Sequence, residues 1–286
     1  MDAMDRLTEL LSRLNPRLVA HIEKYLRKLP SVRAKIEQDT GELMQTLENE
    51  LKPYRDELPT TREIPAEGLS PDGVLESMAA LQNRETDGWK DGYVSGAVYH
   101  GDTAHIDFLN RVYALHSQTN PLHADVWPSI SKYEAEIVAM TAGMLGGEKA
   151  GEEICGTLSS GGTESIMLAM KTYRDRARAE RGIRRPEMVV PITAHAAFDK
   201  AAQYFGIKMV RIPVDRNYRA DIRAAAKAIT RRTVVVVGSA PSFPHGMVDP
   251  IAELSELARQ WGIGFHTDAC LGGFVLPWAE DLGYPV

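Results

Sequence analysis

The sequence predicts an α/β protein with a mostly parallel sheet flanked by helices, preceded by a helical N-terminal arm. Strand-like and helix-like segments alternate from Glu153 onward, as expected of βαβ units with right-handed crossovers. The run TVVVVG at 233–238 is apolar almost throughout, which is typical of a parallel strand covered on both faces. Polar motifs follow several of these strands, at the edge where parallel sheets bind ligands.

Residues 1–60 are predicted to form the helical arm. Leucines recur at helical spacing over 7–18, and Pro16 and Pro30 should kink or end the helices. Basic residues dominate the middle of the arm and acidic residues its end. This mixture favours a solvated amphipathic arm that packs on the body or on a second subunit, with a membrane-surface helix as the alternative.

Residues 61–128 are predicted to form an irregular and helical segment with substrate-side loops. Ser70 as N-cap and Pro71 as first helical residue begin one helix, and a second helix covers about 103–117. The connection GWKDGYVSGAVYHGD at 88–102 is rich in glycine and aromatic residues and too irregular for a helix. Loops of this kind often carry function on a rigid scaffold.

Residues 129–286 are predicted to form a large α/β domain. The domain opens with an amphipathic helix at 129–146, which the glycine pair Gly146-Gly147 ends. The strands expected after it are 154–158, 187–192, 208–213, 233–238 and 263–268. The expected helices are 163–181, 196–205, 221–230 and 250–261.

Composition excludes several classes of protein. The 286 residues are 44% hydrophobic and 25% charged, with a formal net charge of −6, which disfavours a nucleic-acid binder. Cys155 and Cys270 cannot build a disulfide framework and indicate a reduced, cytoplasmic setting. No apolar run approaches the ~20 residues of a transmembrane helix, and the N-terminal sequence lacks a signal-peptide pattern. We therefore expect a cytoplasmic protein without a transmembrane segment.

The first candidate binding motif is GTLSSGGTES at 156–165, between a short predicted strand and a long predicted helix. Its glycines allow close backbone approach, and the first-turn N–H groups, including those of Gly162 and Thr163, favour an anion. The motif has neither the GK[ST] of a Walker A loop nor the GxGxxG of a dinucleotide loop. Phosphate binding is the hypothesis, and a plain capped turn is the alternative.

Two further candidates follow strands. His195 could stack on an aromatic cofactor or shuttle a proton, or simply be a hydrogen-bonded histidine near a helix start. Asp268 ends an apolar strand, where a carboxylate is costly unless paired; a protonated pyridine nitrogen would pair it, and a helix-capping or salt-bridged aspartate is the alternative. A phosphate loop, a ring stacker and a partner for a pyridinium nitrogen are together what a pyridoxal phosphate enzyme needs.

The order of four motifs carries a resemblance to a known family. SGGTES, TAHAAFDKAA, GSAPSFPHG and HTDACLGG resemble the fold-type I pyridoxal phosphate enzymes called group II decarboxylases. The segments SGAVY at 95–99 and NPLHAD at 120–125 are most similar to those members of the group that cleave phosphorylated long-chain bases. The similarity extends from about Gly92 to Val286.

The resemblance implies which residues would bind the cofactor, pyridoxal 5′-phosphate. Gly162 and Thr163 would hold its phosphate. His195 would stack on its pyridine ring, and Asp268 would pair with its ring nitrogen. No metal is implied.

Further site residues are also implied by the resemblance. Ser239 and His245 would lie near the cofactor. Asn120, His123 and Tyr99 would approach the cofactor or the substrate, either in their own subunit or from the neighbouring subunit of a homodimer. Tyr99 and His123 are the candidates for proton transfer or for binding the substrate phosphate.

The activity that the resemblance implies is carbon–carbon cleavage. A phosphorylated long-chain amine, sphingosine or sphinganine 1-phosphate, would be split into phosphoethanolamine and a fatty aldehyde. An L-amino-acid decarboxylase with the same cofactor is one alternative. A catalytically inactive truncated chain or dimer partner is another.

The sequence departs from the family in its last part. The family's Schiff-base lysine lies beyond the aspartate strand, but no lysine follows Asp268. The last lysine is Lys227, and Lys200 should lie about a helical turn from the crevice. The family's small C-terminal domain is also missing, so the α/β domain should be incomplete, with an unpaired sheet edge or an uncovered face. We expect a fragment of a longer protein; a truncated gene product, pairing with a second polypeptide and a complete chain are the alternatives.

Overall fold

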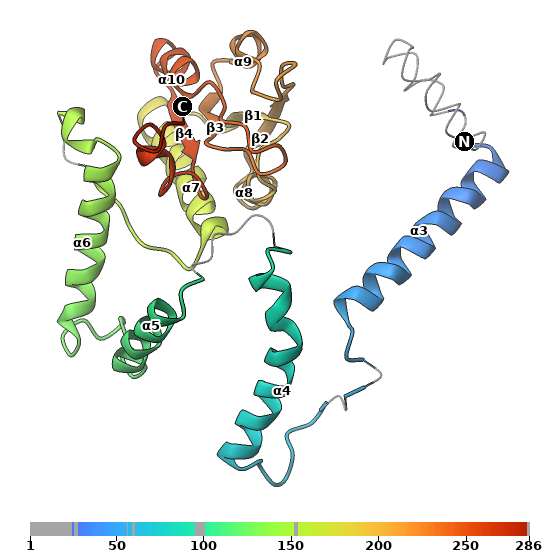
Figure 1. Ribbon diagram of the computed structural model, residues 1–286. Coiled ribbons are helices and arrows are strands. Elements are labelled where there is room, and N and C mark those ends of the chain that lie inside the picture. Colours follow the sequence, from blue (N-terminus) through green and yellow to red (C-terminus); the bar gives the residue numbers. More distant parts are fainter. Residues whose placement is uncertain are drawn as a thin grey trace. The chain divides into compact units, whose positions relative to one another are not determined.

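A computed structural model gives the fold (Figure 1). The chain divides into two compact units, Met1–Leu81 and Gln82–Val286. The structure describes residues 25, 28–55, 57–58, 61–94, 101–151 and 154–284. The predicted division at residues 60 and 128 stays a prediction. None of the helices in the described ranges is long and apolar enough to cross a membrane.

The first unit contains the long helix α3 (Pro30–Leu51). Pro30 stands at the start of this helix, where its missing N–H costs nothing, while Pro16 lies outside the described residues. No residue of α3 is buried, and its exposed face carries i,i+4 ion pairs such as Arg33–Glu37 at 2.9 Å. Helix formation by this part of the arm is therefore confirmed.

Three more helices agree with the sequence-based expectations. Helix α4 (Pro71–Lys90) begins where predicted, and the Ser70 hydroxyl accepts the Gly73 N–H at 3.1 Å. Helix α5 (Thr103–His116) is capped by Asp102. Helix α6 (Pro128–Met144) is followed by Gly146 in the left-handed conformation and by the short 3₁₀ helix η1 (Gly147–Ala150).

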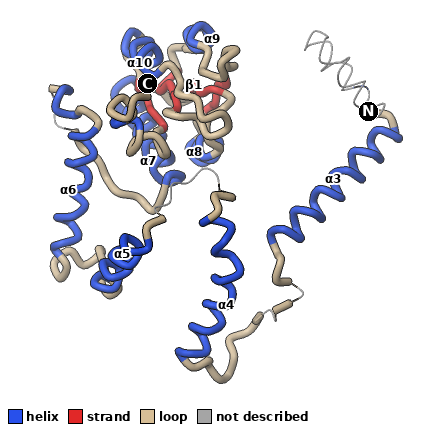
Figure 2. Tube along the Cα trace, viewed as in Figure 1, coloured by secondary structure: helices blue, strands red, loops and turns tan. Residues whose placement is uncertain are grey.

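The second unit contains a sheet of four parallel strands in the order β2-β1-β3-β4, drawn in red in Figure 2. This confirms the predicted parallel sheet. The strands are β1 (Glu187–Pro191), β2 (Lys208–Ile212), β3 (Thr233–Ser239) and β4 (Gly264–Asp268). The helices around them are α7 (Gly162–Arg181), α8 (Ala197–Phe205), α9 (Ile222–Ala228) and α10 (Ile251–Gln260), followed by the 3₁₀ helix η2 (Leu276–Trp278).

The apolar core lies on both faces of this sheet. On one face Met188 and Val235 pack with residues of α7 and α8. On the other face Val189 and Val236 pack with residues of α9 and α10. Because successive strand residues point to opposite faces, the valine run of β3 supplies both cores, and all seven residues of β3 are buried.

The predicted strand at 154–158 is wrong, because this segment is an irregular loop. Its backbone is held by a side chain of α6 instead of by a neighbouring strand. The Leu158 N–H donates to the Glu134 carboxylate at 3.1 Å, and the Thr157 hydroxyl donates to the same oxygen at 3.2 Å. Gly156 lies so close to Val138 of α6 that a Cβ there would be 2.9 Å from a valine methyl.

The sheet has an open edge at β4. Within the described part of the chain, β4 pairs only with β3, and its five residues are all half-buried. A parallel strand is ordinarily covered on both sides. The expected unpaired edge is therefore present, and we call the free side of residues 264–268 the β4 edge.

Candidate functional site

Polar side chains gather where the strands end. Ser239 and Asp268 are the last residues of β3 and β4 and are partners in the parallel register. His195 follows β1. These three side chains line one cavity of about 170 Å³, which is completed by Pro241, Phe243, Cys270 and Leu271.

A second cavity, of about 400 Å³, adjoins the first and shares Asp268 and Cys270 with it. The loop that precedes α7 forms one wall, and the end of β4 forms the other. Its lining includes Gly161, Gly162 and Ser165. The structure therefore places the predicted phosphate loop and the predicted acid around neighbouring cavities.

The N-terminus of α7 is built to approach an anion. Gly161 has φ 156° and ψ 175°, a backbone conformation almost confined to glycine, and α7 has no side-chain cap. The N–H groups of Gly162, Thr163 and Glu164 have no hydrogen-bond partner among the described residues. These N–H groups and the positive end of the helix dipole are a donor set that suits a phosphate.

Hydroxyl and carboxyl groups complete this terminus. The Ser159 and Ser165 hydroxyls lie 2.6 Å apart and can both turn toward a ligand oxygen. The Glu164 carboxylate accepts the Ser160 N–H at 2.7 Å, and hydrogen bonding from Ser160 lowers the pKa of Glu164. A bound anion would lie near the negative charge of Glu164. The N–H and hydroxyl donors of the loop would have to outweigh this repulsion for the anion to bind.

His195 combines the two alternatives that the sequence left open. Its Nδ1 accepts the Ala197 N–H at 3.0 Å, so it is a hydrogen-bonded histidine at the start of α8. The same ring also lines the smaller cavity. With Nδ1 occupied as an acceptor, the proton of the neutral imidazole resides on Nε2.

Asp268 is positioned to receive a cation. Its carboxylate accepts the Cys270 N–H at 3.3 Å, and within the described ranges it forms no ion pair. His266 lies two residues earlier on β4 and lines the larger cavity. Burial lowers the pKa of His266 despite the opposing charge of Asp268, so His266 is neutral near pH 7 and leaves the Asp268 charge unpaired.

Four of the predicted site residues that the structure describes do not line either cavity. Thr163 follows Gly162 but lines neither, and His245 stacks on Tyr218 with ring centroids 4.3 Å apart. Asn120 and His123 are exposed on the turn between α5 and α6, where the Asn120 carboxamide accepts the Leu122 N–H. Tyr99 lies outside the described residues.

The lysines agree with the sequence-based expectation. Lys200 is exposed on α8, with its ammonium over the Tyr204 ring at 5.7 Å from the centroid. Lys227 lies in the last turn of α9. Neither lines the two cavities.

Several residues that line the cavities were not candidates from the sequence, among them Phe243, Cys270 and His266. Two carried a usable signal. Cys270 comes directly after the aspartate strand, and His266 shares a strand face with Asp268 because of the two-residue period. Phe243 carried none, since its place depends on how the loop after β3 folds back.

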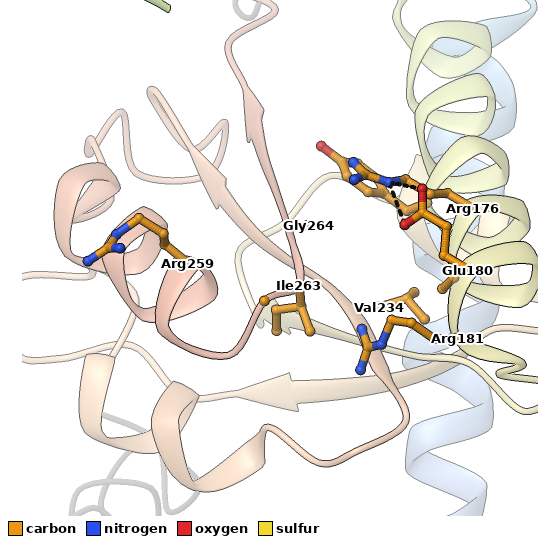
Figure 3. Close-up of a pocket in the computed structure, with 10 residues that line it drawn as sticks. Arg176, Glu180, Arg181, Val234, Arg259, Ile263 and Gly264 are labelled. Carbon is orange, nitrogen blue, oxygen red and sulfur yellow. Dashed lines mark hydrogen bonds and ion pairs between the residues drawn. The ribbon is translucent and has the colours of Figure 1, made fainter.

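Another cavity, of about 320 Å³, lies at the opposite ends of β3 and β4 (Figure 3). Its arginines already have partners: Arg176 pairs with Glu180 at 3.0 Å, and Arg181 donates to backbone carbonyls. It contains none of the predicted site residues. Within the described ranges, no cluster of three or more potential ligands could hold a metal ion.

Comparisons with known proteins agree with this geometry. The pyridoxal-dependent decarboxylase conserved domain matches residues 63–282. A sphingosine-1-phosphate lyase of Arabidopsis thaliana is 43% identical over 94% of this chain and 49% of its own length. The lyase of Oryza sativa subsp. japonica is 45% identical over 91% of this chain and 48% of its own length. The chain thus spans about half the length of the curated relatives it matches.

Solved structures show the same relation. The sphingosine-1-phosphate lyase of Burkholderia pseudomallei superposes with a TM-score of 0.77 and 44% identity, over 82% of this chain and 54% of that one. A glutamate decarboxylase of Lactobacillus brevis superposes with a TM-score of 0.65 at 20% identity, over 80% of this chain and 54% of that one. At that identity the second likeness supports the fold alone.

Proposed function

Because this chain belongs to the pyridoxal-dependent decarboxylase family, we propose that it forms the cofactor-binding part of a sphingosine-1-phosphate lyase. The proposed reaction cleaves sphingosine or sphinganine 1-phosphate to phosphoethanolamine and a fatty aldehyde. The observation that carries this proposal is the identity of 43–45% to two such lyases over more than nine-tenths of the chain.

The chain's own groups fit pyridoxal 5′-phosphate, which when bound accepts the electron pair of the bond that breaks. The free N–H groups at the start of α7 would hold the phosphate, and the Ser159 and Ser165 hydroxyls would add donors. The strained glycine conformation at Gly161 would let the backbone approach it closely.

His195 and Asp268 would act on the pyridine ring. Asp268, which has no cationic partner among the described residues, would keep a proton on the ring nitrogen. The flat imidazole of His195 lines the same cavity and would stack on the ring. Ser239 would complete the wall between them.

The Schiff-base lysine is proposed to come from a part of the protein outside these 286 residues. Lys200 and Lys227 both lie away from the cavities, and no lysine follows Asp268. The relatives are about twice as long as the matched region, which leaves room for such a residue.

The substrate groups are proposed to meet Tyr99 and His123, with Asn120 beside the cofactor. His123 and Asn120 are exposed on one turn, so both are accessible to a neighbouring subunit. We infer a homodimer, because apolar side chains on α5 and α6 such as Tyr113 and Met140 are 77% and 66% exposed. Both cysteines are free, which supports a reducing compartment such as the cytoplasm.

The experiment is a cofactor titration of the purified 286-residue chain. Pyridoxal 5′-phosphate is added, the visible spectrum is recorded, and any imine is reduced with borohydride and mapped to a peptide. We expect the cofactor to bind reversibly, and we expect no one lysine to be labelled specifically. A Schiff-base band with label at one lysine, such as Lys200, would contradict the proposed external lysine.

The substrate class is tested on the enzyme that includes the missing lysine. Release of fatty aldehyde from sphinganine 1-phosphate is the expected result. Release of carbon dioxide from glutamate or tyrosine, with long-chain base phosphates untouched, would instead make the enzyme an amino-acid decarboxylase.

A further inference from the structure

We propose that Asp249 is a positioning residue that fixes Ser239 in the wall of the cofactor cavity. This inference rests on the proposed function only in taking that cavity as the cofactor site. The evidence is the set of hydrogen bonds that Asp249 makes at the end of β3.

Asp249 clamps the backbone of Ser239 from both sides. Its carboxylate Oδ2 accepts the Ser239 N–H at 2.8 Å, while its own N–H donates to the Ser239 carbonyl at 2.9 Å. Ser239 therefore has no free backbone group with which to shift along the strand. The side chain of Ser239 lines the cavity with His195 and Asp268, so the clamp determines where that hydroxyl stands.

The other carboxylate oxygen reaches a different segment. Asp249 Oδ1 accepts the Ala220 N–H at 2.7 Å, and Ala220 ends the turn that holds Tyr218 at φ 59°. Tyr218 in turn stacks on His245 at an interplanar angle of 14°. One buried side chain thus ties the loop after β3 and the turn before α9 to the same residue of the cavity wall.

The clamp is costly, which favours a positional role over a purely stabilising one. Asp249 is only 1% exposed, and within the described ranges no cation lies within ion-pair distance of it. Burial raises the pKa of Asp249, against the two N–H bonds and the charge of Arg219, and the charge of Asp215 adds to the rise. A buried carboxylate without a contacting ion-pair partner is costly, so its hydrogen bonds must compensate for the lost hydration.

A neighbouring aspartate provides a matched control. Asp221 also accepts two backbone N–H bonds, from Arg223 at 2.8 Å and Ala224 at 3.0 Å. Both bonds lie within the first turn of α9, and neither reaches Ser239. Loss of Asp221 should therefore loosen a helix start without moving the cavity wall.

The test compares Asp249→Asn, Asp221→Asn, Ser239→Ala and the Asp249→Asn/Ser239→Ala double variant in the full 286-residue chain. Amide hydrogen exchange is measured for the peptides that contain Ser239 and Ala220, and the dissociation constant for pyridoxal 5′-phosphate is measured by absorbance. An asparagine has one acceptor oxygen and no charge, so one of the two N–H groups loses its partner and the bond to the other is no longer charge-assisted.

We expect Asp249→Asn to speed exchange at Ser239 and Ala220 by about tenfold and to weaken cofactor binding by about three- to tenfold, in line with one lost charge-assisted bond. Asp221→Asn should change exchange only at the start of α9 and leave the dissociation constant within twofold. The double variant should bind pyridoxal 5′-phosphate no more weakly than the single variant with the lower affinity, because both changes act through Ser239.

Two results would overturn the proposal: wild-type exchange at Ser239 in Asp249→Asn, or multiplied effects in the double variant. If Asp249→Asn does not fold, NMR of the wild-type chain provides the test. The amide chemical shifts of Ser239 and Ala220 should change with pH together with the signal of the Asp249 carboxyl. Amide shifts that change independently of that carboxyl would reject the clamp. Absence of cofactor binding by the wild-type chain would reject the proposed cofactor site, whereas the exchange data would still judge the clamp.

Discussion

Three carboxylates around the sheet are stabilised in three different ways. Glu187 is 1% exposed and meets the cations Arg232 at 2.6 Å and Lys208 at 3.2 Å. Asp249 is equally buried but bonds only to backbone N–H groups. Asp268 faces a cavity with no cation among the described residues. Residue identity alone did not separate these roles, because each depends on what the fold brings opposite the carboxyl.

The ionic group at Glu187 is expected to stabilise the fold. Glu187→Gln should lower the free energy of unfolding by about 1–3 kcal/mol, because the two cations lose the carboxylate charge and an NH2 donor replaces one of the two oxygens that accept from them and from the Thr230 hydroxyl. Urea unfolding followed by circular dichroism measures the change. Glu256→Gln, which breaks an exposed pair with Arg259, should give no measurable difference; equal losses in the two variants would contradict the expectation.

His266 should make stability depend on pH. Burial lowers its pKa from 6.5, so below pH 6.5 the unfolded chain binds more protons than the folded chain. The stability contributed by the neutral imidazole is therefore present above pH 6.5 and is lost as the pH falls. The unfolding midpoint of the wild type should drop between pH 7.5 and 5.5 by more than that of His266→Phe. Parallel pH profiles would show that another group is responsible.

At the scale of elements, most of the fold was predictable from the sequence. All four strands of the sheet, the helix that precedes them and the three helices between them lie within a few residues of the expected bounds, because a valine run, helical spacing and glycine stops are local signals. Gly182 and Gly206 do end their helices in the left-handed conformation. The loop at 154–158 escaped prediction because the Glu134 side chain, distant in sequence, satisfies its backbone.

The site was predictable in part for the same reason. Ser239 and Asp268 end their strands and His195 follows β1, so topology alone brings them to the carboxyl ends of the strands. His245 also follows a strand but turns to the Tyr218 ring, which lies on a separate turn. A long-range contact of this kind leaves no local pattern in the sequence.

Two glycines should respond in opposite ways to the same substitution. A Cβ on Gly272 would overlap the Ala240 carbonyl at the end of β3, so Gly272→Ala should cost at least about 1–3 kcal/mol. Gly143 lies in the last turn of α6 with no atom within 4 Å of its Cβ position, so Gly143→Ala should add up to about 0.5 kcal/mol. Thermal unfolding of both variants measures the signs; a stabilised Gly272→Ala would mean that the two strand ends can separate freely.

At the scale of the whole molecule, the two units contribute unequally to the candidate site and to the buried core. The candidate site lies entirely in Gln82–Val286, and α3 buries no residue. A chain that begins at residue 61 should therefore unfold at the same temperature as the full chain, within about 2 °C. Circular dichroism at 222 nm tests this, and a clear drop would show that the arm stabilises the second unit.

The β4 edge also has a consequence for how this polypeptide behaves among its own copies. The opposite edge of the sheet carries the exposed charges Lys208 and Arg211, a protection against strand pairing between molecules. The β4 edge has no lysine or arginine: its one charged residue, Asp268, stands at the last position, and the Phe265 carbonyl accepts the Tyr173 hydroxyl at 2.6 Å. Phe274 and Tyr284, which follow β4 in the chain, are 65% and 67% exposed. Pairing of the β4 edge with a further strand of the same chain has a rate that does not depend on protein concentration. The rate of pairing with a strand of another molecule increases with concentration. Dilution, more than buffer or temperature, should then govern whether the polypeptide stays monodisperse, and a cell that makes it must cover the edge before two copies meet.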